Sequence, residues 1–155
     1  MPYVITGLDP APYVPLFGAD EAALDARRVH RMIADSNVGF PCRVTLADAP
    51  TGSRLLLLNH LSRIDDGPYR ASHAIFVRED AREAAVYEAQ VPPLMRHRVL
   101  SLRGFGGDGL MVDALLAQPG EADAGLRKLL DNPTIHEVDV HTATRGCFLA
   151  RARRA

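Results

Sequence analysis

Hydrophobic and polar positions alternate along much of this chain, and short alternating or β-branched runs predict β-strands. The last two runs lie on either side of a turn that ends at Gly146, so they predict a terminal hairpin. Including this hairpin, the predicted strands cover residues 3–6, 42–47, 54–59, 74–78, 97–105, 110–116, 135–141 and 147–151.

Other segments follow the spacing of a helix. Residues 20–35 carry one apolar stripe and Asp20 can cap the first turn, which predicts a helix over this range. A second amphipathic helix is predicted to begin at Glu121 and to stop at Asn132-Pro133. Residues 80–88 predict a short third helix.

The order of the strands favours hairpins over crossovers. Strands 42–47 and 54–59 are predicted to pair across a Pro-Thr-Gly turn, and the strands before and after the glycine-rich segment 104–109 are expected to pair likewise. Few connections resemble the repeated crossovers of a parallel sheet. We therefore predict an α+β fold, a mostly antiparallel sheet with two or three helices, in a single domain over residues 1–155.

Composition and charge narrow the class of protein. At 47% hydrophobic and 24% charged residues, the chain has the composition of an ordinary globular domain. The longest strongly apolar run is residues 55–58, and residues 1–17 do not resemble a signal peptide, so we expect a cytoplasmic protein with no membrane partner. The net charge of −1 gives no attraction to nucleic acid, and Arg151, Arg153 and Arg154 are expected to form a solvated tail.

Two cysteines, Cys42 and Cys147, are far apart in the sequence and are expected to be free thiols in a reducing cytosol. Cys42 is predicted to lie in the core. Two thiols cannot form a four-ligand zinc site, and the scattered histidines lack metal-ligand spacing. We therefore predict no metal site and no cofactor.

The glycines of segment 104–109 match the spacing of a dinucleotide-binding loop. Such a loop must open a helix, and residues 110–118 are too short for that helix before Pro119-Gly120. The favoured interpretation is a flexible hairpin turn.

The strand 135–141 carries the most reactive chemistry. His136 and His141 are five residues apart, so they cannot form a helical zinc-protease motif. On a strand, Glu137, Asp139 and His141 share one face, where a carboxylate can orient the imidazole or raise its pKa. The slightly favoured alternative is an ordinary solvent-exposed face.

Cys147 is a candidate nucleophile, with His141 or His73 as its base and Arg145 nearby to favour the thiolate. In a tight hairpin residue 141 would pair with 148, which argues against a Cys147–His141 dyad within the hairpin itself.

The loop before strand 74–78 gathers groups that can bind an anion. Tyr69, Arg70 and His73 lie there, and the Arg70 guanidinium can hold an oxyanion with two hydrogen bonds. The equally supported alternative is that Arg70 bridges carboxylates and Tyr69 anchors the loop.

Several motifs together resemble a bacterial family known only as a domain of unknown function. The resemblance runs from Phe40 to Arg154 and is most specific from His141 to Cys147. It implies a small single-domain cytoplasmic protein, and it supplies no activity. The motifs that carry it are Pro41-Cys42-Arg43, Tyr69-Arg70-Ala71-Ser72, Ile75-Phe76-Val77, Arg103, His141 and Gly146-Cys147-Phe148.

Three functional hypotheses follow. In the first, a small anionic ligand binds in a polar pocket between the terminal hairpin and loop 69–73, where Arg70 and Arg145 hold the charge, Tyr69 and His141 donate hydrogen bonds, and Asp139 lies nearby. In the second, the protein is a cysteine-dependent enzyme that uses Cys147. In the third, it is a partner-binding module, such as a homodimer formed through an exposed strand edge.

Overall fold

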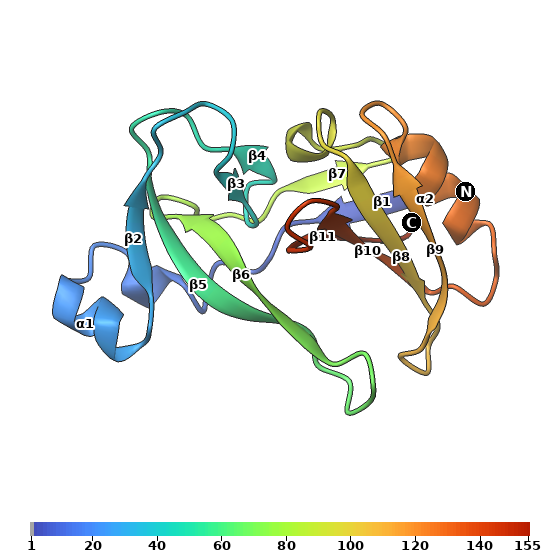
Figure 1. The fold of residues 1–155 in the computed structure, drawn as a ribbon, viewed down its shortest axis with the longest axis horizontal. Helices are drawn as coiled ribbons and strands as arrows, with labels where there is room; N and C mark the ends of the chain where they lie inside the picture. The colour runs from blue at the N-terminus through green and yellow to red at the C-terminus, as the bar shows by residue number, and fades with distance from the viewer. Residues whose placement is uncertain (1) are drawn as a thin grey trace.

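The structure, a computed structural model, describes residues 2–155 and contains two β-sheets that lie side by side (Figure 1). The first sheet has six strands, and every neighbouring pair is antiparallel. Its strands lie in the order β7 (Val86–Glu88), β1 (Tyr3–Thr6), β11 (Phe148–Arg154), β10 (Glu137–Thr142), β8 (Leu100–Phe105) and β9 (Met111–Ala117).

The second sheet has five strands, and only its β3–β6 contact is parallel. The order is β2 (His30–Ile33), β5 (Arg54–Arg63), β6 (Ala71–Arg78), β3 (Pro41–Cys42) and β4 (Ala47–Asp48). The helices are α1 (Glu21–Ala26) and α2 (Ala122–Leu130), with short 3-10 turns at Val14–Leu16 and Pro93–Met95. The fold is therefore mostly antiparallel β-structure with two α-helices, which agrees with the α+β prediction at that level.

The helix α2 covers one face of the first sheet. Its Leu126 and Leu129 are buried in one apolar cluster with Leu102 and Val140 of the sheet. The helix lies close to the strands at Gly125, where an added Cβ would come within 2.7 Å of the Leu102 side chain. The opposite face of this sheet therefore remains available for contact with the second sheet.

The second sheet has a core of its own. Leu56, Leu58, Ile75 and Val77 point from β5 and β6 into a cluster that Leu24 of α1 also enters. Cys42 is fully buried in this cluster, as predicted. No helix among residues 2–155 is both long and apolar enough to cross a membrane.

Several local predictions are confirmed. Helix α2, the β8–β9 hairpin and the terminal β10–β11 hairpin are present, and His141 pairs with Phe148 as expected. The glycine-rich segment forms the β8–β9 turn, where the Gly106 amide donates to the Leu110 carbonyl at 2.9 Å. The dinucleotide-binding interpretation is thereby excluded, since no helix opens on these glycines.

The helix predicted over residues 20–35 is wrong beyond its first two turns. Asp20 does cap α1, where its carboxylate accepts from the Ala23 amide at 2.8 Å. Arg28 then adopts a positive φ of 58°, and residues 30–33 pair with β5 as an edge strand. The apolar stripe that suggested a helix is shared between α1 and this strand, because sheet pairing outweighs the helical propensity of the second half.

The hairpin predicted between strands 42–47 and 54–59 is also wrong. A tight turn separates β3 from β4, with Leu46 at a φ of 56°, and β5 instead pairs with β2 and β6. Since β5 runs to Arg63 and β6 starts at Ala71, the loop between them covers only residues 64–70. The predicted helix 80–88 is absent, and β7 pairs there with β1.

Candidate anion pocket at the seam of the two sheets

The polar face of β10 lies against the second sheet. Asp139 is 0% exposed and His141 is 3% exposed, although both point away from the core under α2. Strands β5 and β6 cover them, with the Arg63 guanidinium 3.0 Å from Asp139 and the His73 ring centroid 5.0 Å from that of His141. The solvent-exposed interpretation of this face was wrong, because it is the contact surface between the sheets.

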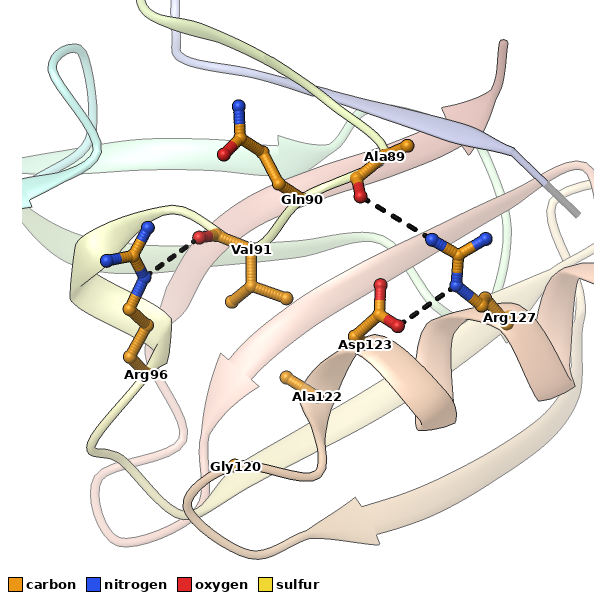
Figure 2. A pocket seen from close by; sticks show the side chains of 8 residues that line it. All are labelled: Ala89, Gln90, Val91, Arg96, Gly120, Ala122, Asp123 and Arg127. Atoms are coloured by element: carbon orange, nitrogen blue, oxygen red, sulfur yellow. Dashed lines mark hydrogen bonds and ion pairs between the residues drawn. The ribbon is translucent and has the colours of Figure 1, made fainter.

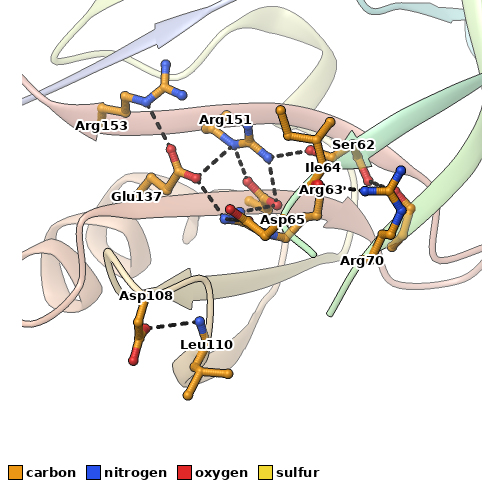
Figure 3. Close-up of polar contacts among 12 residues, drawn as sticks. Ser62, Arg63, Ile64, Asp65, Arg70, Asp108, Leu110, Glu137, Arg151 and Arg153 are labelled. Carbon is orange, nitrogen blue, oxygen red and sulfur yellow. Dashed lines mark hydrogen bonds and ion pairs between the residues drawn. The ribbon is translucent and has the colours of Figure 1, made fainter. Parts of the chain in front are cut away.

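Two arginines neutralise Asp139 at this seam. Arg63 donates to Asp139 Oδ2 at 3.0 Å and to Glu137 Oε1 at 3.0 Å. Arg151 donates to Asp139 Oδ2 at 3.1 Å. It also donates to the Ser62 carbonyl at 2.7 Å (Figure 3). The network joins β5, β10 and β11, so we expect it to hold the two sheets together.

Sequence reasoning missed Arg63, and it assigned Arg151 to a solvated tail, which is wrong. A register shift between Val140 and His141 places Arg151 opposite Asp139, whereas the unshifted hairpin would pair Asp139 with residue 150. Arg154 is also held, since it donates to the Leu130 carbonyl at 2.7 Å. The sequence did contain a signal for these cationic partners, because two carboxylates that alternate on a half-buried strand must be compensated by positive charge.

A cavity of about 200 Å³, here called the seam pocket, opens beside this network. The loop between β5 and β6 and the terminal hairpin both border it, which is the arrangement that the anion hypothesis requires. In Figure 1 the tip of the β5–β6 hairpin lies near the β8–β9 turn. The pocket is lined by Ser62, Arg63, Pro68, Tyr69, Arg70, Ala71, Arg103, Phe105, Met111, Asp139 and His141.

Arg103 is a half-buried cation that lines this pocket. Its Nε donates to Ser101 Oγ at 3.1 Å, and within residues 2–155 its two terminal amino groups have no protein acceptor. Arg63, by contrast, pairs both of its terminal amino groups with carboxylates and stacks 3.8 Å from the Phe105 ring centroid. Arg103 therefore offers hydrogen-bond donors and positive charge to an occupant.

The loop supplies two further donors. Arg70 is exposed and uses one amino group on the Ile64 carbonyl at 2.6 Å. Tyr69 packs its ring edge-on against Phe105 with centroids 5.6 Å apart, and in the described part of the chain its hydroxyl has no hydrogen-bond partner. Both side chains can thus reach an anion at the mouth of the pocket.

His141 is neutral at physiological pH. Its Nδ1 lies 2.9 Å from the Gly146 carbonyl, so this nitrogen carries the proton and Nε2 is left as an acceptor. Burial lowers the pKa of His141 to about 4, the Gly146 carbonyl partly opposes this, and the positive charge of Arg103 lowers it further. The first functional hypothesis gave His141 a donor role toward the ligand, whereas this tautomer directs the imidazole proton to Gly146 and leaves Nε2 to accept a hydrogen bond.

His73 packs against His141 at the seam but does not line the seam pocket. Its Nδ1 lies 3.1 Å from Ser62 Oγ, and burial, followed by the charge of Arg103, lowers its pKa. His60 pairs with His73 across β5 and β6, and its ring centroid is 5.7 Å from that of Phe148. Two cross-strand pairs, His60–His73 and Phe148–His141, thus pack on each other at the seam.

The remaining predicted residues lie elsewhere. Cys147 and Arg145 line a different cavity of about 460 Å³, so Arg70 and Arg145 do not share a pocket. Cys147 Sγ is 4.0 Å from the Arg145 carbonyl, and among residues 2–155 it has no hydrogen bond to either His141 or His73. The structure does not bring together a Cys–His dyad.

A third cavity, of about 380 Å³, lies at the start of α2 (Figure 2). Its acidic group is engaged within the protein: Asp123 accepts from Arg127 at 3.0 Å and from the Tyr3 hydroxyl at 2.6 Å. Arg96 donates to the Val91 carbonyl at 3.2 Å. This cavity therefore offers no open charge of the kind that Arg103 provides.

Within residues 2–155 no three His, Cys, Asp or Glu side chains gather closely enough to hold a metal ion.

The fold and the pocket define a class of protein, a two-sheet and mostly antiparallel domain with an arginine-lined cavity at the seam. Residues 39–154 match the family described as "Protein of unknown function (DUF1203)", and the chain belongs to this family. The matched range contains the whole lining of the seam pocket. No curated protein and no solved structure matches the chain.

Proposed function

We propose that this protein is a cytoplasmic binding protein for a small, singly protonated oxyanion such as hydrogen phosphate, held in the seam pocket. The observation that carries the proposal is Arg103, a half-buried cation whose terminal amino groups have no acceptor within the described chain. Guanidinium groups bind oxyanions with paired, charge-assisted hydrogen bonds. Arg70 and the Tyr69 hydroxyl add donors at the same cavity.

The size of the pocket supports a small ligand. Drug-sized ligands occupy cavities of roughly 300–1,000 Å³. The seam pocket has about 200 Å³, which suits a phosphate, a sulfate or a short carboxylate.

The neutral imidazole of His141 favours a ligand that carries a proton. His141 lines the pocket, and its only uncommitted nitrogen, Nε2, accepts hydrogen bonds. A hydrogen phosphate ion has a P–OH group that can donate to Nε2, whereas sulfate at neutral pH has no such group. Phosphate is therefore expected to bind more tightly than sulfate.

Calorimetric titration of the full chain with phosphate and with sulfate at pH 7 tests the proposal. We expect Arg103→Gln to weaken phosphate binding roughly tenfold or more, since a hydrogen bond to a charged group contributes about 1.5–3 kcal/mol. Arg27→Gln is the matched control, because it removes an exposed charge that follows α1. The proposal fails if phosphate does not bind at millimolar concentration, or if both variants bind it equally.

The two other hypotheses have less support. Cysteine-dependent catalysis would need a base, and no imidazole bonds to the Cys147 thiol among residues 2–155. Homodimer formation finds support at β9, an edge strand on which Val112 and Leu116 are 43% and 59% exposed. Both stay predictions.

A further inference from the structure

The cavity that contains Arg145 and Cys147, here called the hairpin pocket, differs from the seam pocket in size and in chemistry. It has about 460 Å³, within the range of pockets for drug-sized ligands. Strands of the second sheet form one wall and the β10–β11 turn forms another. Its lining comprises Met32, Gly39, Pro41, Arg43, Leu57, Ala74, Phe76, Arg98, Thr142, Thr144, Arg145 and Cys147.

Arg43 is a buried cation without a carboxylate partner. It is 3% exposed, donates from Nε to the Phe148 carbonyl at 2.8 Å and from Nη1 to the Pro41 carbonyl at 2.6 Å, and lines the hairpin pocket. Within residues 2–155 it forms no ion pair, and its Nη2 has no hydrogen-bond partner. A buried charge is normally paired, so an anion in this pocket would compensate Arg43.

Arg43 remains charged when the protein is folded. Burial lowers its pKa to about 10, which is still well above physiological pH. The positive charge in the pocket is therefore permanent under ordinary conditions.

The other charges of the pocket leave Arg43 uncompensated. Arg98 donates two hydrogen bonds to the Asp48 carboxylate, at 2.5 and 3.0 Å, so this pair is neutral. Arg145 is exposed on the hairpin turn and has no ion pair within the described residues. The Thr142 hydroxyl accepts from the Cys147 amide at 3.2 Å, which leaves its own proton free to donate. These groups together form a site for an anionic head.

The opposite wall is apolar. Leu57 and Phe76 pair across β5 and β6 and are half-buried, and Met32 of β2 is 37% exposed. These side chains line the same cavity as Arg43. An ion as small as phosphate would leave this surface in water, whereas a ligand with an apolar body would cover it.

We propose that the hairpin pocket binds a molecule with an anionic head on an apolar chain, with Arg43 and Arg145 at the head and Leu57, Phe76 and Met32 around the chain. This site is separate from the seam pocket and takes a different class of ligand. Carboxylate and phosphate heads share the chemistry that Arg43 recognises.

The test titrates the full chain with octanoate, octyl phosphate, acetate and octanol. Octanoate and octyl phosphate are kept below their critical micelle concentrations. We expect the two amphipathic anions to bind at least tenfold more tightly than acetate and octanol. Only these two ligands can place an anion beside the arginines and also cover the apolar wall. The tighter of octanoate and octyl phosphate identifies the head group. Equal binding of octanol and octanoate, or no binding of either amphipathic anion, overturns the proposal.

The Cys147 thiol provides a readout at the site itself. Cys42 is fully buried and Cys147 is half-buried on the pocket wall, so iodoacetamide should label Cys147 first. The amphipathic anion that binds is expected to slow this labelling at least fivefold, and inorganic phosphate to leave it unchanged. An unchanged rate at saturating amphipathic anion would contradict the proposed location.

Variants separate this site from the seam pocket. Arg145→Gln should weaken the binding of the amphipathic anion about fivefold, which is the usual effect of a partly exposed ion pair. Arg27→Gln and Arg103→Gln should leave it unchanged, so failure here and failure of phosphate binding are independent results. Arg43→Gln should abolish binding if it folds. If it does not fold, Arg145→Gln decides the question, and undiminished binding to Arg145→Gln overturns the proposal.

Discussion

Asp139 shows how one residue can join two sheets. Its carboxylate is fully buried and accepts hydrogen bonds from Arg63 of β5 and Arg151 of β11. Removing one partner of a buried ion pair leaves the other charges uncompensated, which is more damaging than losing an exposed pair. Asp139 is therefore the fully buried anion of a seam network that also contains Glu137.

We expect Asp139→Asn to lower the free energy of unfolding by about 3 kcal/mol or more, since the buried Arg63 and the partly buried Arg151 would both lose a fully buried anionic partner. Asp65→Asn is the matched control, because Asp65 pairs with the same Arg63 but its side chain is 51% exposed. The control should lose no more than about 1 kcal/mol. Urea denaturation measures both, and equal losses would contradict a special role for Asp139.

At the scale of the element, the terminal hairpin combines a local turn with a register shift. Gly146 closes the turn at a φ of +75°, and an added Cβ would meet nothing within 4 Å. The requirement for glycine is thus one of backbone conformation, not of space. The shift between Val140 and His141 then sets which side chains face the seam.

Gly146→Ala should destabilise the protein by about 1 kcal/mol, because an L-residue at this φ is strained. Gly67→Ala is the control, since Gly67 lies in the loop between β5 and β6, also has open space around it, and has no positive φ. Thermal unfolding of both variants checks the prediction, which fails if the two melting temperatures shift equally.

At the scale of the whole molecule, the contact between the sheets contains imidazoles that must stay neutral. The pKa values of His60, His73 and His141 are all lowered, in each case mainly by burial. Arg103, His73 and Asp139 are the charged or titratable groups that act on His141, and the first two oppose its protonation. Acid should therefore loosen the seam before it affects the separate apolar cores.

The stability of the protein should fall as the pH drops from about 6.5 towards 4. The unfolded chain takes up protons on these histidines near pH 6.5, whereas folded His141 does so only near its pKa of about 4. Protons thus favour unfolding across this window, by about 1.4 kcal/mol per pH unit and about 3 kcal/mol in all for His141. Urea denaturation at several pH values measures the slope.

His141→Asn should flatten this pH dependence, since the amide keeps a donor for the Gly146 carbonyl but does not titrate. His136→Gln is the control variant, because His136 is exposed and precedes β10, outside the contact between the sheets. A slope that His141→Asn does not alter would show that His141 is not the group that links stability to pH.

Local pattern was sufficient for some elements and not for others. Helix α2 and the β8–β9 and β10–β11 hairpins were predicted because their signals are contained within a few neighbouring residues. The predicted helix 20–35 failed because β2 depends on β5, which is more than twenty residues away in the sequence. The helix predicted over 80–88 failed likewise, since β7 exists only through its pairing with β1.

By itself, the sequence determined the two faces of β10, because alternation along a strand is a local property, and it identified Tyr69, Arg70 and His141 as groups near one pocket. Only the tertiary structure decided that the polar face is buried, that Arg63 and Arg151 neutralise Asp139, and that Arg145 and Cys147 belong to a separate pocket with Arg43. The physical reason is that compensation of a buried charge depends on which distant strands meet. Arg63 and Asp139, 76 residues apart, have no local pattern in common.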